Sequence, residues 1–74
     1  MFVDEEYVKL TYTRCSYDGS RFDDLDSAKH NCSVDSSCAG IYDMYCRGYS
    51  FYLCENGTIE DTQNDDCVHN KKSK

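Results

Sequence analysis

The stretch AKHNCSVDSSCAGIYD, residues 28–43, contains the change from helix to strand that decides the fold. Before and within it, Leu25, Ala28 and Cys32 recur at helical spacing and form one narrow apolar face. This pattern predicts a helix over residues 24–33. Because two to three turns of helix are not stable alone, we expect the helix to pack on the rest of the chain, held there by a disulfide through Cys32.

The segments on both sides of this stretch are typical of strands. Residues 7–15 alternate, with Val8, Leu10 and Tyr12 on one side. Apolar and aromatic runs at 39–43 and 49–54 flank a connection that contains glycine, which predicts a β-hairpin. Residues 67–71 are expected to form a closing strand beside the first. Polar connections are expected at residues 16–20 and 55–66. The predicted class is α+β, with one helix packed on an antiparallel sheet in a single domain, residues 1–74.

Six cysteines compensate for a thin apolar core. The chain has 74 residues, and only nine of them are Ile, Leu or Val. No Cys-x-x-Cys motif occurs, and neither histidine has zinc-finger spacing to a cysteine pair, which excludes the common redox and zinc sites. An even number of cysteines in so short a chain predicts three disulfides formed in an oxidising compartment. We therefore expect a secreted, extracellular protein. The spacing of the cysteines alone does not fix which of them pair with one another.

Residues 28–43, followed by Phe51-Tyr52-Leu53-Cys54 and by Cys67-Val68, resemble the PAN/apple superfamily, in particular the short PAN-like modules of secreted invertebrate proteins. The resemblance covers about residues 15–70 and rests mainly on the five-residue gap between Cys32 and Cys38. It implies a helix cradled by a curved antiparallel sheet, in a secreted module that binds proteins or carbohydrates and is not an enzyme. Where the family has a further helix cysteine, this chain has Ala28.

The same resemblance implies part of the disulfide pattern. It pairs Cys32 with Cys38 and ties the terminal strands together through Cys15 and Cys67, which leaves Cys46 to pair with Cys54 by elimination. A fully extended segment between Cys46 and Cys54 spans about 26 Å, far more than the ~7 Å that a disulfide tolerates, so this pair requires the chain to double back. Two alternatives remain open. One pairs Cys46 with Cys15, and the other pairs Cys32 with Cys54 and Cys38 with Cys46.

Charge excludes two classes of partner. Fourteen acidic and eight basic residues leave a net charge of −6. Nucleic-acid binding and attraction to anionic membranes both need a basic surface, so neither nucleic-acid binding nor membrane insertion is expected. The one basic cluster, residues 71–74, is interpreted as a solubilising tail. Asn56 begins an Asn-Gly-Thr sequon and is the candidate glycosylation site.

Catalytic chemistry is not indicated. With all six cysteines in disulfides no thiolate nucleophile is left, and His30 and His69 are interpreted as structural residues. No cofactor is expected. Asp23, Asp24 and Asp26 are weak candidates for a calcium site because carboxylate oxygens suit that ion. The stronger interpretation is that Asp23 or Asp24 caps the helix.

The aromatic residues are the better lead to function. Seven tyrosines exceed what a small core buries with satisfied hydroxyls. Tyr45, Arg47 and Tyr49 lie together in or beside the hairpin connection, and Tyr and Arg are enriched where binding energy concentrates. We therefore predict that this connection contacts a protein or glycan partner.

The sequence thus predicts a secreted, disulfide-stabilised recognition module with no catalytic activity. Two other classes fit the same composition. One is an acidic, tyrosine-rich matrix or adhesive component that binds calcium, and the other is a secreted signal, venom-like effector or inhibitor.

Overall fold

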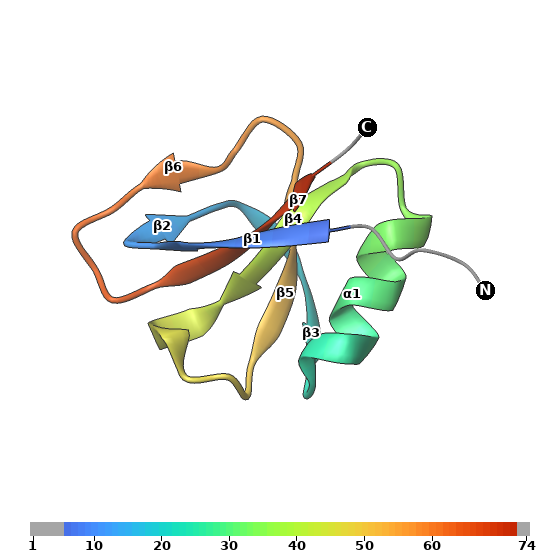
Figure 1. Ribbon diagram of the computed structural model, residues 1–74, viewed down its shortest axis with the longest axis horizontal. Coiled ribbons are helices and arrows are strands. Elements are labelled where there is room, and N and C mark those ends of the chain that lie inside the picture. Colours follow the sequence, from blue (N-terminus) through green and yellow to red (C-terminus); the bar gives the residue numbers. More distant parts are fainter. Residues whose placement is uncertain (1–5, 73–74) are drawn as a thin grey trace.

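The structure, a computed structural model, describes residues 6–72. Five antiparallel strands form one sheet in the order β1-β7-β4-β5-β3, and helix α1 (Leu25–Val34) packs on one face of it (Figure 1). The fold is therefore α+β, as predicted. The strands of this sheet are β1 (Glu6–Thr11), β3 (Tyr17–Phe22), β4 (Cys38–Asp43), β5 (Phe51–Glu55) and β7 (Cys67–Lys72).

Helix α1 begins where the sequence provides a cap. Asp24 is the N-cap, and its carboxylate accepts a hydrogen bond from the backbone N–H of Ser27 at 2.9 Å. Ala28 and Cys32 are fully buried, as the helical spacing predicted, and they form a core with Ile41 of β4 and Phe51 of β5. This core holds the helix on the sheet.

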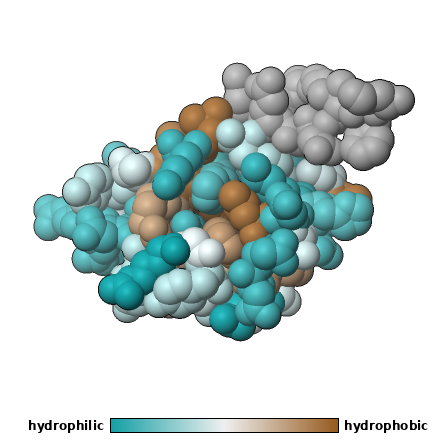
Figure 2. Space-filling model, turned by 60° about the horizontal axis from the view of Figure 1, so that its bottom comes forward, coloured by the Kyte–Doolittle hydropathy of each residue, from teal (hydrophilic) through white to brown (hydrophobic). Residues whose placement is uncertain are grey.

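Several hydrophobic side chains around this core are partly exposed to solvent. Phe22, Leu25 and Leu53 are only half-buried where they pack against the core. Figure 2 shows hydrophobic residues in the middle of one face with hydrophilic residues around them. The thin core predicted from composition is therefore also incompletely covered.

The opposite face of the sheet carries a second core. Cys15, Tyr42, Cys54 and Val68 are buried there. This side also has a short two-stranded sheet made of β2 (Thr13–Arg14) and β6 (Glu60–Asp61), which pair antiparallel. Residues 55–66, predicted to be an exposed loop, therefore contain a strand, and Asp66 at their end is 5% exposed.

Two strands differ from the sequence-based prediction. Residues 17–20 of the predicted turn at 16–20 belong to β3, and the turn-forming Gly19 lies where the pairing of β3 with β5 shifts register. The first predicted strand breaks at Tyr12, whose φ is +52°. Within β1 the predicted apolar side is only partly covered, with Val8 42% exposed and Leu10 half-buried, whereas Tyr7 packs against the core beneath α1.

All six cysteines are paired. The pair that the resemblance implied between Cys32 and Cys38 is present, with Cα atoms 5.2 Å apart. The implied pairs Cys15–Cys67 and Cys46–Cys54 are wrong, and so are the alternatives that linked Cys46 to Cys15 or to Cys38. The structure contains Cys15–Cys54 and Cys46–Cys67 instead, with Cα separations of 5.6 and 5.0 Å.

Strand order explains this connectivity. β7 pairs with β4 so that Cys67 lies opposite Asp43, and the short 3-10 helix η1 (Met44–Cys46) brings Cys46 back over that position. Near the C-terminal end of β5, Cys54 lies opposite Tyr17 of β3, and this pairing places Cys15 beside Cys54. The terminal strands β1 and β7 pair through their backbones and need no disulfide between them.

Candidate functional site

The connection between β4 and β5 exposes the residues that the sequence singled out. Tyr45 is 60% exposed and Tyr49 is 54% exposed, and Arg47 is exposed between them. Tyr45 lies in η1, at the end of the molecule opposite α1 (Figure 1). Arg21 reaches across from β3 to the carbonyl oxygen of Tyr49 at 3.5 Å. The predicted residues are thus all accessible to a partner.

The backbone of this connection adopts a conformation that its residues disfavour. Tyr45 and Cys46 both have φ of +57°, the left-handed region that normally favours glycine. One such residue costs on the order of 1–3 kcal/mol and persists only where its surroundings impose it. Two in succession, neither of them glycine or asparagine, mark this turn as one that the rest of the fold holds in place.

Buried carboxylates and a disulfide hold this turn. The backbone N–H of Tyr45 donates to Oδ1 of Asp66 at 3.0 Å, and the N–H of Gly48 donates to Oδ1 of Asp43 at 3.0 Å. Both carboxylates are nearly buried, with Asp43 3% and Asp66 5% exposed. The disulfide from Cys46 to β7 fixes the end of η1. These contacts explain how the unfavourable backbone is maintained.

Tyr12 has the same kind of backbone and joins the same site. It is 55% exposed, its φ is +52°, and its carbonyl oxygen accepts a hydrogen bond from the N–H of Thr62 at 2.8 Å. The next residue, Thr13, donates its N–H to the carbonyl oxygen of Asp66 at 3.2 Å. Asp66 therefore contacts the backbone of Tyr45 and the backbone of Thr13, the residue that follows Tyr12.

A cavity of about 260 Å³ lies between these segments. It brings together two exposed tyrosines, two adjacent aspartates and one disulfide. Its lining residues are Thr11, Tyr12, Tyr45, Cys46, Asp65, Asp66 and Cys67. Of the three predicted contact residues, Tyr45 lines the cavity, whereas Arg47 and Tyr49 do not. The cavity is also lined by Tyr12, which the sequence assigned only to an alternating strand.

Asp66 also interacts with Tyr42, a buried tyrosine outside the cavity lining. Burial raises the pKa of Tyr42 well above its ordinary value, and a hydrogen bond to the Asp66 carboxylate raises it further. The ring of Tyr42 lies 5.2 Å from that of Tyr17 and 6.2 Å from that of Tyr52, centroid to centroid. A packed aromatic cluster is therefore linked, through Tyr42, to a carboxylate that lines the cavity.

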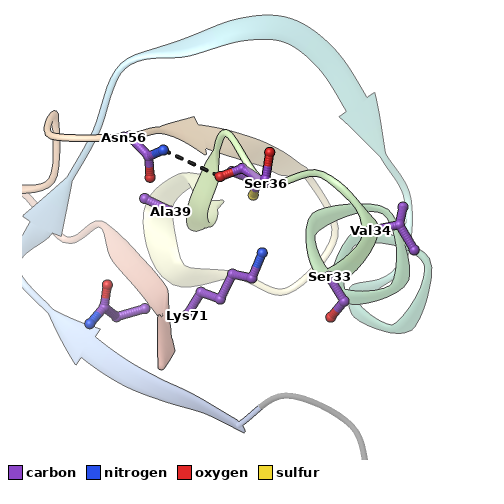
Figure 3. Close-up of a pocket in the computed structure, with 8 residues that line it drawn as sticks. Ser33, Val34, Ser36, Ala39, Asn56 and Lys71 are labelled. Atoms are coloured by element: carbon purple, nitrogen blue, oxygen red, sulfur yellow. Dashed lines mark hydrogen bonds between the residues drawn. The ribbon is translucent and has the colours of Figure 1, made fainter. Parts of the chain in front are cut away.

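A second cavity of about 440 Å³ lies at the helix end of the molecule, between the C-terminus of α1, the start of β4 and the end of β7. Figure 3 shows Asn56 at its rim, where the side-chain amide donates to the carbonyl oxygen of Ser36 at 3.4 Å. Asn56 is exposed, which is compatible with its sequon. Its glycosylation stays a prediction.

The interpretation of residues 71–74 as a solubilising tail is wrong for its first residue. Lys71 belongs to β7 and points into this second cavity (Figure 3). Its Nζ donates to the carbonyl oxygens of Cys32 at 2.7 Å and Asp35 at 3.3 Å, where α1 ends. A cation at a helix C-terminus is stabilising, so Lys71 is a structural residue. Residues 73 and 74 lie outside the described part.

Two of the three candidate calcium ligands have other roles. Asp24 caps the helix, and hydrogen bonds from Ser27 hold its pKa below the usual range. Asp23 pairs with Arg21 at 2.8 Å, and Asp26 lies exposed in the first turn of α1. Within residues 6–72, no group of three or more His, Cys, Asp or Glu side chains has an arrangement that holds a metal ion.

The two histidines have different environments. His30 is exposed on α1, whereas His69 is half-buried on β7, 6.4 Å from the Phe51 ring. Burial lowers the pKa of His69, while the nearby Asp43 carboxylate partly opposes that effect. His69 therefore lies against the helix-side core and apart from the Tyr12–Tyr45 cavity.

Wider comparisons add no further assignment. None of the helices within the described residues is long and apolar enough to cross a membrane. Comparison with protein-family models, curated proteins and solved structures finds no match to this chain.

Proposed function

We propose that this protein is a secreted, non-catalytic recognition module that binds an extracellular partner at the cavity between Tyr12 and Tyr45. One observation carries the proposal. Two of the most exposed tyrosines, 55% and 60% accessible, border one cavity, and each has a left-handed backbone that tyrosine disfavours. Such local strain concentrates at ligand-binding sites, where it holds side chains in the geometry that binding needs.

A preformed aromatic site favours binding for two physical reasons. Tyrosine provides a large contact area with few rotatable bonds, and it is enriched among residues that dominate binding energy. A site already held in its bound geometry avoids the entropy cost of ordering loops on association. Here Asp66 and the Cys46–Cys67 disulfide supply that order before any partner arrives.

Secretion is supported by the cysteine chemistry. Three disulfides and no free cysteine characterise small domains that fold in oxidising compartments. The resemblance of residues 15–70 to PAN/apple modules implies the same location and a partner that is a protein or a carbohydrate.

The proposal is tested with the natively oxidised protein on arrays of extracellular proteins and glycans. We expect saturable binding to at least one member that a Tyr12→Leu/Tyr45→Leu double variant loses and a Tyr49→Leu variant retains. Tyr49→Leu is the matched control because Tyr49 is equally exposed and lies outside the cavity lining. Binding that the double variant retains, or no binding to any member, contradicts the proposal.

A further inference from the structure

We propose that the Tyr12–Tyr45 cavity accepts the cationic side chain of a lysine or arginine from a partner polypeptide. This inference rests on the proposed function and assigns the chemistry of the ligand. Four properties of the cavity support it, namely its size, its hydrogen-bonding groups, its charge and its aromatic walls.

The size of the cavity suits one side chain. Pockets that enclose a whole drug-sized ligand have volumes of about 300–1,000 Å³, and this one has about 260 Å³. It lies open at the surface between two exposed rings, Tyr12 and Tyr45. A single protruding group fits that space, and the rest of a polypeptide partner is left to lie across the surrounding surface.

The hydrogen-bonding groups of the cavity favour a ligand that only donates. Asp65 and Asp66 provide carboxylate oxygens, which accept hydrogen bonds, and the backbone N–H of Tyr45 is already bonded to Asp66. Among the cavity-lining residues that the structure describes, none is Lys, Arg or His. Ammonium and guanidinium groups donate hydrogen bonds, accept none and carry a positive charge, so they match a lining that contains two carboxylates.

Charge favours the same ligand. The ion pairs found between residues 6 and 72 join Arg14 to Glu60 and Arg21 to Asp23, and neither involves Asp65 or Asp66. Asp65 is exposed and Asp66 is 5% exposed, and a carboxylate that no cation of the protein pairs with attracts a cation that comes near it. The net charge of −6 also attracts a basic partner from a distance.

The aromatic walls complete the match. A cation over the face of a tyrosine ring is attracted by the negative potential of that face. The protein already contains this contact at its other end, where Nζ of Lys29 lies 5.5 Å from the centre of the Tyr7 ring. The described lining of the cavity contains no cation, so the rings of Tyr12 and Tyr45 are available to a cation of the partner.

The test is a titration followed by amide NMR spectra of the oxidised protein at low salt. The probes are three blocked pentapeptides, each with four glycines around a central lysine, arginine or norleucine. We expect the lysine and arginine peptides to shift the amide signals of Tyr45 and Asp66 saturably, and the uncharged norleucine peptide to bind at least about fivefold more weakly. Salt at 0.5 M is expected to reduce the difference, because it screens charge.

Variants locate the effect. Tyr45→Leu, Tyr12→Leu and Asp65→Asn are each expected to weaken binding of the lysine peptide about two- to fivefold, the range of one exposed cation–π contact or ion pair. Tyr49→Leu and Glu55→Gln are the matched controls, since both residues are exposed and outside the cavity lining, and they are expected to leave binding unchanged. A dispersed amide spectrum verifies that each variant is folded.

Three outcomes overturn the inference. These are equal binding of the lysine and norleucine peptides, signal shifts that map away from the cavity, and cavity variants that behave like the controls. A neutral glycan that binds on the array and requires Tyr12 and Tyr45, together with no preference for the charged peptides, rejects the cationic ligand while the recognition function survives. Lysine-peptide binding that only the cavity variants weaken, with no array ligand, supports the cationic site and counts against the wider function.

Discussion

The helix side of the molecule and the cavity end are held together in opposite ways. On the helix side, Asp24 caps α1, Ala28 and Cys32 face the core, and Cys38 closes a short disulfide loop. Each of these elements follows the local preference of its sequence. At the cavity end, Tyr12 and Tyr45 have left-handed backbones that their side chains disfavour. Distant contacts impose that conformation, and this difference is the reason why we propose the binding site at the cavity end.

The largest expected difference concerns the disulfides. Cys46 and Cys67 are 21 residues apart, whereas Cys32 and Cys38 are 6 apart. In the chain-entropy model, replacing the first pair by alanine lowers the free energy of unfolding by about 3 kcal/mol and replacing the second by about 2 kcal/mol. Denaturant unfolding of the two double variants measures both losses. A greater loss from the Cys32–Cys38 replacement contradicts the account.

A smaller effect is expected at Asp66. Asp66→Ala leaves the N–H of Tyr45 and the hydroxyl of Tyr42 without their acceptor, which lowers the free energy of unfolding by about 2 kcal/mol. The neighbouring Asp65→Ala is the control, because Asp65 is exposed and surface substitutions change stability by less than about 0.5 kcal/mol. Equal losses from the two variants argue against Asp66 as the anchor of the cavity.

Asp66→Ala is also expected to change the pKa of Tyr42. Because the native pKa of Tyr42 is raised, its contribution to stability is complete below its ordinary pKa near 10 and is lost as the pH rises above that value. Removing the Asp66 carboxylate lowers the pKa of Tyr42, although burial still keeps it above the ordinary value. NMR titration of the Tyr42 ring measures both pKa values, and an unchanged pKa in Asp66→Ala refutes the coupling.

On the helix side the expected effect is smaller and local. Asp24→Ala removes the acceptor for the N–H of Ser27 and lowers the free energy of unfolding by about 1 kcal/mol, the usual cost of losing an N-cap. We expect the amide signals of Tyr12 and Tyr45 to stay in place in this variant. Shifts at the cavity as large as those in α1 show that the two regions are not independent.

The smallest effect is a pH dependence carried by His69. Burial lowers its native pKa, and Lys9 and Lys29 lower it further, while Asp43 opposes them. The contribution of neutral His69 to stability is therefore complete above its ordinary pKa near 6.5 and is lost as the pH falls below that value. His69→Gln is expected to flatten the stability profile between about pH 5 and 7. An unaltered slope excludes His69 as its source.

The helix side was also the part that the sequence predicted best. The helical spacing of Ala28 and Cys32 and the caps at Asp23 or Asp24 are local signals, and α1 and β4 lie close to the predicted positions. The β4–β5 hairpin was predicted for the same reason, since apolar runs and turn composition are visible within each segment. The pairing of the last strand with the first was also expected and is present.

The cavity end was harder to predict because it depends on strand order. Tyr45 was identified because tyrosines crowd the hairpin around Arg47, but nothing near Tyr12 in the sequence indicates that the strand breaks there or that it meets Tyr45. Cys46 and Cys67 come together because β7 inserts between β1 and β4. That placement is a property of the whole sheet, so the spacing of the cysteines did not reveal it.

The central claim is that Tyr12 and Tyr45 are held in their left-handed conformation before any partner binds. The most direct measurement is the backbone φ of both residues, from HN–Hα couplings and intraresidue NOEs of the free, oxidised protein. We predict positive φ at both residues, near the values of +52° and +57°, with no averaging toward the extended region. Negative or averaged φ at either tyrosine contradicts the account of a preformed site.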